Sequence, residues 1–477
     1  MIEPVKKILP LAVGVLVWLL PTPEGLTVQA WAYFALFIGV VVALVTEPIP
    51  AAVSGLIGVV LAVVLQLVPL QPGAEITAKS SLQWGLSGFQ NGTVWLIFSA
   101  YIFSLGYQKT GLGRRIALHL IKLLGRKSIG LGYAVALADL ALAPFIPSNT
   151  ARSGGTIYPI ASNIPPMYGS TPDEEPRKIG SYLYWTAFST TCVTSSMFLT
   201  GLAPNLLALS IIEKITGHEI SWINWWLGFL PIGLLLFFFV PLLNYLIYPP
   251  SLKQAKEMPE WATQELNKLG QLTRHELMMA GLAVLALVLW IFGGELLSST
   301  TAGLTILCLM ILTGVINWSD IISHKQAWNV LVWFATLVTL AGGLSKTGFL
   351  AWLADSMSHL MSGYDAMTMM VLIIISFFLL HYFFASITAH VTALLPVFLT
   401  LAMTIPDMPI IQLSMLLCFT LGIMGVITPY AAGPGPIWYG SGYIPNKDFW
   451  VLGFILGIIF LATLLLVGIP WLHMMNL

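Results

Sequence analysis

Charged residues are scarce in this chain. They make up 8% of its 477 residues, whereas soluble globular proteins carry about 25%. Hydrophobic residues make up 57%, and the mean hydropathy is +0.88. This composition excludes a soluble enzyme, a disordered protein and a nucleic-acid-binding protein, because so much apolar surface has to face lipid. Basic and acidic residues number 20 each, so the net charge identifies no partner.

Cysteine patterns are lacking as well. Cys192, Cys308 and Cys418 lie singly inside apolar runs, which indicates packed thiols and neither a disulfide framework nor a metal site. We expect no cofactor and no metal. The N-terminus resembles a signal peptide, but Pro21-Thr22-Pro23-Glu24 follows its apolar run where a small-residue cleavage site would stand. We therefore predict a retained first helix and a bacterial cytoplasmic membrane location.

Long apolar runs are numerous, and a helix needs about 20 apolar residues to cross a bilayer. Two further apolar segments, near 130–162 and 368–400, are broken at their centres by small polar residues, which predicts re-entrant helical hairpins enclosed by protein or water. The sequence thus predicts an all-α polytopic membrane protein with two such hairpins and eleven transmembrane spans, at Ile8–Leu20, Val28–Val45, Ala51–Leu70, Val94–Tyr107, Tyr182–Ile215, Trp222–Ile247, Leu277–Phe292, Ala302–Ile316, Val330–Leu344, Ile410–Tyr430 and Trp450–Leu472.

Positive charge sets the predicted orientation. Residues 109–127 carry six basic residues and no acidic residue, which favours the cytoplasm, as do Lys6 and Lys7. With the N-terminus inside, the fourth span returns to the cytoplasm just before 109–127, so the two criteria agree. The polar stretch 249–276 is then a cytoplasmic amphipathic linker, and the C-terminus lies outside.

Three motifs recur in one register. The offsets between the paired motifs are 238, 237 and 238 residues, and the two copies of the surrounding span run in opposite directions through the membrane. We therefore predict inverted repeats at 28–248 and 277–477, preceded by an extra helix at 1–27. Such repeats with interrupted helices are typical of secondary transporters, whose substrate site lies near the bilayer midplane. The pairs are Val94-Trp95 with Val332-Trp333, Lys109-Thr110-Gly111 with Lys346-Thr347-Gly348, and Ser148-x-Thr150-Ala151-Arg152 with Ser386-x-Thr388-Ala389-His390.

The two hairpin tips are candidate substrate contacts. Each offers a serine and a threonine hydroxyl together with free N–H groups at a half-helix N-terminus, which attract anions. One such pair can also back-bond within its own helix, but two pairs in symmetric positions favour binding. Further breaks follow each hairpin, at Thr200–Asn205 and at Gly425–Pro436, which include Thr428 and Pro429.

Two basic side chains, Arg152 and His390, lie one helical turn after the hairpin serines. A cation at this depth is costly and usually functional, so both are candidate counter-charges for a ligand with a carboxylate at each end. Two alternatives stay open: Arg152 pairs with Asp139, and His390 is a neutral core histidine. Asp139 and His381 also form a possible pair, or they line the path. The predicted ligand is a C4–C5 dicarboxylate.

With these residues in view, the chain resembles the divalent anion/sodium symporter family, which includes Indy-type transporters, citrate–succinate antiporters and 2-oxoglutarate–malate translocators. Ser148-Asn149-Thr150 matches the family's hairpin signature, and 148–155 is most similar to the 2-oxoglutarate–malate branch. The resemblance implies a homodimer that works as an elevator. It implies that substrate carboxylates are held by Ser148, Asn149, Thr150, Ser386 and Thr388, with Thr428 and Pro429 at the border of the site.

The second hairpin departs from the family pattern. Ile387 stands where sodium-coupled members carry asparagine, while Asn149 is retained. We therefore predict sodium-independent exchange of 2-oxoglutarate, malate or succinate, with the fixed charges of Arg152 and His390 hindering the return of the empty carrier. The alternative is a sodium-coupled symporter that uses Asn149 with the Gly201–Asn205 and Thr428 regions. An intramembrane serine enzyme and a channel are weaker alternatives, because paired serines suit binding and no filter-like ring of charges is present.

Overall fold

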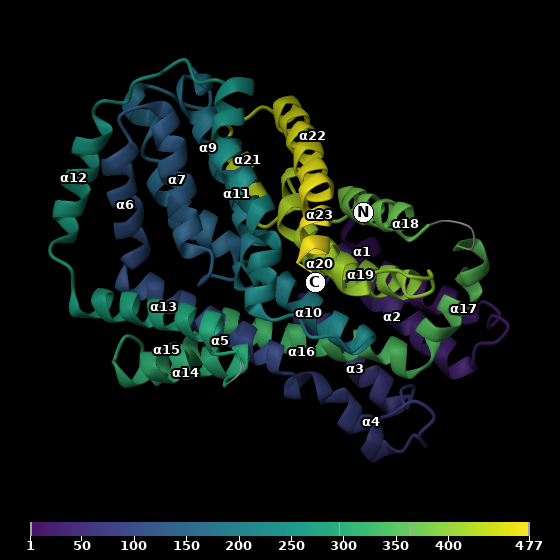
Figure 1. The fold of residues 1–477 in the computed structure, drawn as a ribbon. Helices are drawn as coiled ribbons and strands as arrows, with labels where there is room; N and C mark the ends of the chain where they lie inside the picture. Colours follow the sequence, from purple (N-terminus) through teal and green to yellow (C-terminus); the bar gives the residue numbers. More distant parts are fainter. Residues whose placement is uncertain (1, 295, 362–364, 476–477) are drawn as a thin grey trace. The chain divides into compact units, whose positions relative to one another are not determined.

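The computed structural model describes residues 2–294, 296–361 and 365–475, which form helices and no strands. The predicted first and last segments also include residues 1, 476 and 477, which lie outside the described residues. The chain divides into two compact units (Figure 1). Both units draw segments from both predicted repeats, so the repeat boundaries remain a prediction. Unit 1 comprises Met1–Phe98, Leu206–Ile220 and Lys325–Leu417, and unit 2 comprises Ser99–Asn205, Ser221–His324 and Cys418–Leu477.

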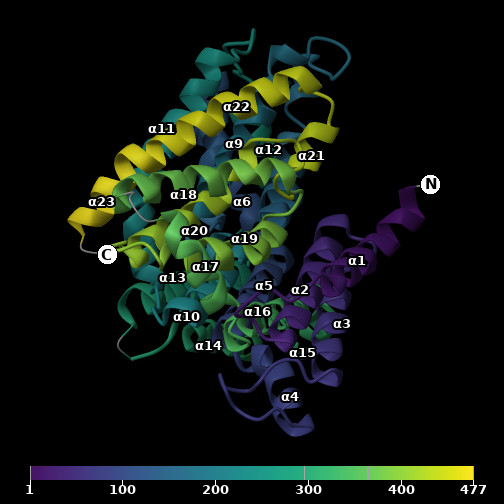
Figure 2. The ribbon, with the colours of Figure 1, turned by 90° about the vertical axis from the view of Figure 1, so that its right-hand side faces the viewer.

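Unit 1 contains the N-terminal helices and the second broken segment. The first two helices lie side by side (Figure 2), and their small residues allow a close approach, because a Cβ added to Gly14 would lie 3.2 Å from the carbonyl oxygen of Ala35. Its elements are α1 (Ile2–Leu19), α2 (Val28–Thr46), α3 (Ala51–Val64), α4 (Ala78–Gly85), η1 (Ser87–Gln90), the start of α5 (Gly92–Thr110), most of α10 (Ala203–Thr216), α16 (Lys325–Lys346), α17 (Phe349–Met361), α18 (Ala366–Leu380), η6 (His381–Phe383), α19 (Ile387–Ala402) and the start of α20 (Ile410–Ile423).

Unit 2 contains the first broken segment and most of the C-terminal helices. It also holds the remainders of α5, α10 and α20. Its other elements are α6 (Leu112–Leu124), α7 (Ser128–Leu142), the π-helix η2 (Thr150–Ile157), α8 (Tyr158–Ala161), η3 (Pro165–Tyr168), η4 (Pro176–Lys178), α9 (Gly180–Met197), η5 (Leu199–Gly201), α11 (Trp222–Ile247), α12 (Met258–Leu269), α13 (Arg274–Phe292), α14 (Ser299–Leu312), α15 (Trp318–Ser323), η7 (Met424–Val426), α21 (Gly435–Gly440), α22 (Asn446–Thr463), the π-helix η8 (Leu464–Gly468) and α23 (Ile469–Met474).

Both predicted hairpin segments are helices broken at their centres. In the first, α7 ends at Leu142, and Pro144 and Pro147 keep the chain out of regular helix until Thr150. In the second, α18 ends at Leu380 and is followed by the short 3-10 helix η6. Ser386 then caps the N-terminus of α19. The order α5, α6, α7, broken tip, α9 is the same as the order α16, α17, α18, broken tip, α20, and the inverted repeat itself stays a prediction. The sequence reasoning missed α6 and α17.

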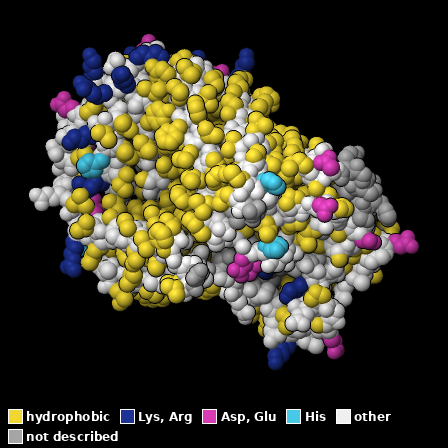
Figure 3. All heavy atoms as spheres, in the orientation of Figure 1, with side chains coloured by type: hydrophobic (Ala, Val, Ile, Leu, Met, Phe, Trp, Pro, Cys, Tyr) yellow, Lys and Arg dark blue, Asp and Glu magenta, His cyan; other side chains and the backbone are white. Residues whose placement is uncertain are grey.

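Among the described residues, six segments are long and apolar enough to cross a membrane. Five further apolar helices are shorter, among them the hairpin arms α7 and α19. Figure 3 shows hydrophobic side chains over broad areas of one face of unit 2, with Lys and Arg gathered along the edge where α6 and α12 lie. The six segments are Val28–Thr46, Trp222–Ile247, Arg274–Phe292, Lys325–Lys346, Ala366–Phe383 and Asn446–Met474.

A buried ion pair joins α6 to the start of α13. Arg115, which is 7% exposed, donates from Nε to Glu276 at 2.6 Å and from Nη2 at 3.2 Å. Its Nη1 also donates to the carbonyl oxygen of Gly270 at 3.0 Å. Thr273 and Glu276 form a capping box at the same helix end. The Arg115 side chain of α6 therefore holds the N-terminal end of α13, at the end of the 249–276 linker.

The ion pair between Lys109 and Asp320 of α15 is expected to make a small contribution to stability that depends on pH. The Asp320 carboxylate accepts a 2.5 Å hydrogen bond from Lys109, which is the main cause of a pKa below the ordinary range of an aspartate. A lowered pKa adds stability above the pKa of the unfolded chain, and this stability is lost as the pH falls through the folded value. Because the pair is partly exposed, Asp320→Asn is expected to cost less than about 1 kcal/mol at neutral pH.

This cost should disappear in acid, where the carboxyl of the parent is protonated as well. Thermal unfolding of the detergent-solubilised protein at neutral and acid pH measures it. A difference from the parent that persists unchanged in acid would contradict the ion-pair explanation.

Candidate functional site

The tip of the first hairpin carries Ser148, Asn149 and Thr150. Ser148 Oγ accepts a hydrogen bond from the Ala151 N–H at 3.2 Å, and the Arg152 N–H donates to the Ser148 carbonyl at 2.8 Å. The serine is thus used as a helix cap, and its own O–H remains able to donate to a carboxylate. Asn149 is 6% exposed. The tip therefore presents two hydroxyls and an amide at the start of η2.

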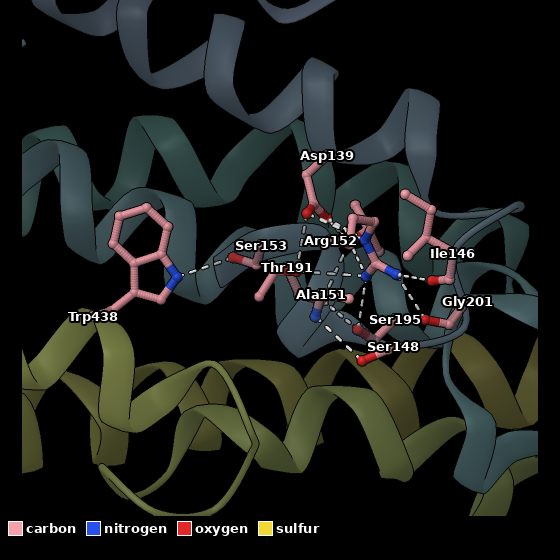
Figure 4. A network of polar contacts seen from close by, with 11 residues as sticks. Asp139, Ile146, Ser148, Ala151, Arg152, Ser153, Thr191, Ser195, Gly201 and Trp438 are labelled. Atoms are coloured by element: carbon pink, nitrogen blue, oxygen red, sulfur yellow. Dashed lines mark hydrogen bonds and ion pairs between the residues drawn. The ribbon is translucent and has the colours of Figure 1, made fainter. Parts of the chain in front are cut away.

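Arg152 lies at the centre of a buried polar network (Figure 4). It is fully buried, and its Nε donates to both oxygens of Asp139 at 3.2 Å. Its Nη1 donates to the carbonyl oxygens of Ile146 and Gly201, both at 2.8 Å. Its Nη2 lies within hydrogen-bond distance of hydroxyls on α9, at 3.4 Å from Thr191, 3.3 Å from Thr194 and 3.0 Å from Ser195. All five N–H groups of the guanidinium are therefore occupied.

This geometry favours the alternative in which Arg152 pairs with Asp139, and its role as a counter-charge for the substrate stays a prediction. Its charge is balanced by Asp139, which also accepts hydrogen bonds from the hydroxyls of Thr191 and Thr194. The alternative pairing with Asp139 describes the structure. Arg152 also joins the carbonyl before the tip, at Ile146, to the carbonyl in the break after α9, at Gly201. It is a positioning residue that holds two irregular segments together.

The break between α9 and α10 packs against the same tip. Thr200 donates to the Pro144 carbonyl at 2.5 Å, and the Ala203 N–H donates to the Pro147 carbonyl at 2.7 Å. The amide nitrogen of Asn205 donates to the Ser195 carbonyl at 2.8 Å. Its side-chain oxygen is buried without a hydrogen-bond partner. The sequence singled out Gly201 and Asn205 as a loop or cation site. The structure places Gly201 beside the first tip, where Arg152 binds its carbonyl, and places Asn205 against the end of α9.

The second break, which contains Thr428 and Pro429, also reaches the first tip. A Cβ added to Gly433 would lie 1.9 Å from Thr150 Oγ1, so the backbone there touches the threonine hydroxyl. Trp438 Nε1 donates to Ser153 Oγ at 2.9 Å (Figure 4). Thr428 is fully buried, and its Oγ1 has no hydrogen-bond partner. Unit 2 therefore brings both breaks into contact with the first tip, and each break contains one buried polar atom without a hydrogen-bond partner.

The second hairpin tip belongs to unit 1. Ser386 Oγ accepts a hydrogen bond from the Ala389 N–H at 3.4 Å and caps α19. Thr388 follows in the first turn and is 6% exposed. Ile387 precedes it with an apolar side chain that cannot coordinate a cation. This tip thus repeats the serine cap and the threonine, but it lacks the asparagine of the first tip.

His390 lies in an aromatic surround within unit 1. Its ring centroid is 4.4 Å from Phe377, 5.0 Å from His381 and 5.1 Å from Phe384, and the side chain is fully buried. Neither ring nitrogen has a hydrogen-bond partner. These described ring neighbours are two phenylalanines and a histidine, so a positive charge on the buried His390 ring would be costly. This surround favours the alternative of a neutral core histidine, and the counter-charge role of His390 stays a prediction.

The hydroxyls of α9 that surround Asp139 and Arg152 were missed at the level of sequence. The available signal was the run Ser189-Thr190-Thr191-Cys192-Val193-Thr194-Ser195-Ser196, which is rich in hydroxyls inside a predicted span. Every residue of this run is buried. Such a run in a buried helix indicates a polar network opposite it.

Comparison with known proteins shows which family the chain matches and which transporters are similar to it. Residues 2–477 match the family described as "Sodium:sulfate symporter transmembrane region". An L-tartrate/succinate antiporter of Escherichia coli K12 is 46% identical over 474 residues, covering 98% of this chain and 97% of that protein. A citrate/succinate antiporter of the same strain is 45% identical over 478 residues, covering 99% and 98%.

Among solved structures, the Alcanivorax borkumensis YdaH transporter is similar with a TM-score of 0.59, covering 89% of this chain and 97% of that chain. Its sequence identity is 14%, so this likeness concerns the fold alone. It agrees with the predicted all-helical transporter fold.

Proposed function

Because the chain belongs to the sodium:sulfate symporter family, a family of membrane transporters and not of enzymes, we propose that it is an antiporter of C4–C5 dicarboxylates. Succinate is the common substrate in the names of the Escherichia coli relatives, with L-tartrate or citrate as the exchanged partner. Malate and 2-oxoglutarate carry the same two carboxylates at similar spacing. The family resemblance further suggests a homodimer that moves its substrate as an elevator across the cytoplasmic membrane.

The observation that favours sodium-independent exchange is the position of the Arg152 guanidinium. In sodium-coupled carriers, unwound backbone carbonyls coordinate the ion. Here Nη1 of Arg152 holds two such carbonyls, those of Ile146 and Gly201, each at 2.8 Å. A covalently attached cation thus occupies oxygens that a sodium ion would use, which favours sodium-independent transport.

The expected preference for exchange is supported by unsatisfied polar atoms in the two breaks that contact the first tip. Thr428 Oγ1 and Asn205 Oδ1 are buried without hydrogen-bond partners. A buried polar group left unpaired costs about 1–3 kcal/mol. A dicarboxylate accompanied by its remaining water would satisfy such groups together with the tip N–H groups. The empty carrier would move with them unpaired, so its return is expected to be slow.

Sodium-coupled symport is the second candidate. Asn149 at the first tip matches the family signature, and the free side-chain oxygen of Asn205 is a suitable cation ligand. The two candidates differ in their response to sodium and to substrate on the far side of the membrane.

Uptake of labelled succinate into proteoliposomes tests exchange directly. We expect rapid uptake into vesicles preloaded with succinate or tartrate, and little uptake into empty vesicles. Vesicles without protein control for leakage. Equal uptake into empty and preloaded vesicles would contradict exchange, and uptake of none of the dicarboxylates would contradict the substrate class.

A further inference from the structure

A cavity of about 890 Å³ lies within unit 2, beside the first hairpin. Ile146 and Ala151 line one part of it, so it extends to the tip that carries Ser148, Asn149 and Thr150. Gly155 lines it as well, and a Cβ added there would meet no atom within 4 Å. The cavity therefore provides open space next to the candidate substrate contacts.

The opposite wall of the cavity comes from the amphipathic helix α12. Trp261, Glu265 and Leu269 line it from this helix, and Arg114 lines it from α6. The two helices pack side by side (Figure 1). The predicted orientation places both on the cytoplasmic side. The cavity is thus a space between the cytoplasmic surface helices and the hairpin tip.

Its charged groups form one cluster. Arg114 Nη2 donates to Glu265 at 2.8 Å, and Lys268 donates to the other oxygen of the same carboxylate at 2.6 Å. The Arg114 side chain is 53% exposed, and that of Glu265 is 14% exposed. Hydrogen bonds from Lys268 and Arg114 hold the pKa of Glu265 below its ordinary range, so the carboxylate stays ionised. The charged residues that line the cavity are therefore Arg114 and Glu265, while Lys268 binds the same carboxylate from outside the lining and adds a positive charge next to it.

We propose that this cavity is a second dicarboxylate-binding position, in which Arg114 receives a substrate carboxylate on the cytoplasmic side before the substrate reaches the tip. Glu265 is the internal competitor that occupies Arg114 in the absence of substrate. A planar guanidinium binds carboxylates through parallel hydrogen bonds, and Trp261 and Leu269 offer apolar surface for the carbon chain. This inference rests on the proposed dicarboxylate exchange.

The test is the KM for succinate exchange in membrane vesicles of each orientation. Inside-out vesicles present the cytoplasmic face to labelled substrate, and right-side-out vesicles present the opposite face. Arg114→Gln is expected to raise the KM about fivefold in inside-out vesicles only, which is the scale of an exposed ion pair. Glu265→Gln is expected to lower it, because Arg114 is released from its competitor. The double variant should behave like Arg114→Gln.

Two control variants separate a local site from a general effect of surface charge. Lys122 is an exposed residue of α6 that does not line the cavity, so Lys122→Gln should leave the KM unchanged. Arg114→Lys retains the positive charge but lacks the planar guanidinium, so it should restore only part of the affinity. The differences in KM between the Arg114 and Glu265 variants and the parent should become smaller in concentrated salt, which screens exposed charges.

The outcomes distinguish this inference from the proposed function. If the parent exchanges succinate but Arg114→Gln and Glu265→Gln leave the KM unchanged, or change it equally in both orientations, the second site is contradicted and the exchange proposal stands. An equal shift in Lys122→Gln would also contradict it. If the parent exchanges no dicarboxylate, the proposed function itself fails.

Discussion

Arg152→Gln is expected to reduce exchange at least about 100-fold and to destabilise the protein. Removing the guanidinium leaves the Asp139 carboxylate buried without its ion-pair partner, and breaking a buried pair in this way costs about 3–5 kcal/mol. It also removes the donor shared by the carbonyls of Ile146 and Gly201. The tip and the break after α9 would then lose their common anchor. Exchange of succinate in preloaded proteoliposomes and thermal unfolding in detergent measure the two effects.

A second variant separates stability from positioning. In Arg152→Gln/Asp139→Asn neither buried charge remains, so we expect part of the lost thermal stability to return. Exchange should stay low, because the two carbonyls still lack the guanidinium. Lys109→Gln is the control, since it breaks a partly exposed ion pair with Asp320. Arg152→Gln with the exchange rate and unfolding temperature of the parent would overturn the positioning role.

Gly433→Ala is expected to reduce exchange about tenfold to 100-fold while leaving the helices folded. The added Cβ would lie 1.9 Å from Thr150 Oγ1 and 3.3 Å from Thr150 Cβ, so the threonine must turn its hydroxyl away. Loss of one well-placed hydrogen bond to a charged ligand costs about 1.5–3 kcal/mol, which corresponds to this range. The measurement is the rate of succinate exchange together with circular dichroism of the purified variant.

Gly440→Ala is the matched control for this variant. It adds the same methyl group at the end of α21, where no atom lies within 4 Å of the new Cβ. We expect exchange like that of the parent. If Gly433→Ala also exchanges like the parent, the Thr150 hydroxyl at its observed position is not required for binding.

The broken hairpins were predictable from the sequence because small polar residues interrupt otherwise apolar runs. Ser148 and Ser386 were found by their common register, and the structure gives both the same capping role. The family resemblance, carried by Ser148-Asn149-Thr150, is confirmed by the match over residues 2–477. Patterns that depend on backbone periodicity and local chemistry were therefore available before the structure.

Contacts between distant segments were not predictable in the same way. The sequence offered Arg152 both a substrate and Asp139 as partner, because spacing alone does not determine where a long side chain points. The contact of Gly433 with Thr150 joins segments almost 300 residues apart in the sequence, and no local sequence pattern predicts it. The helices α6 and α17 were not predicted because neither contains a long apolar run. The sequence likewise left two alternatives open for Arg152 and for His390, because burial and contact partners distinguish them.

The most direct test of the central claim is the sodium dependence of exchange. Labelled succinate uptake into succinate-preloaded proteoliposomes is measured while sodium is replaced by choline at constant ionic strength. With Arg152 holding the carbonyls of Ile146 and Gly201, we predict the same exchange rate with and without sodium. An exchange rate that rises with sodium and saturates would contradict the account, because the ion would then have a binding site that the guanidinium does not fill.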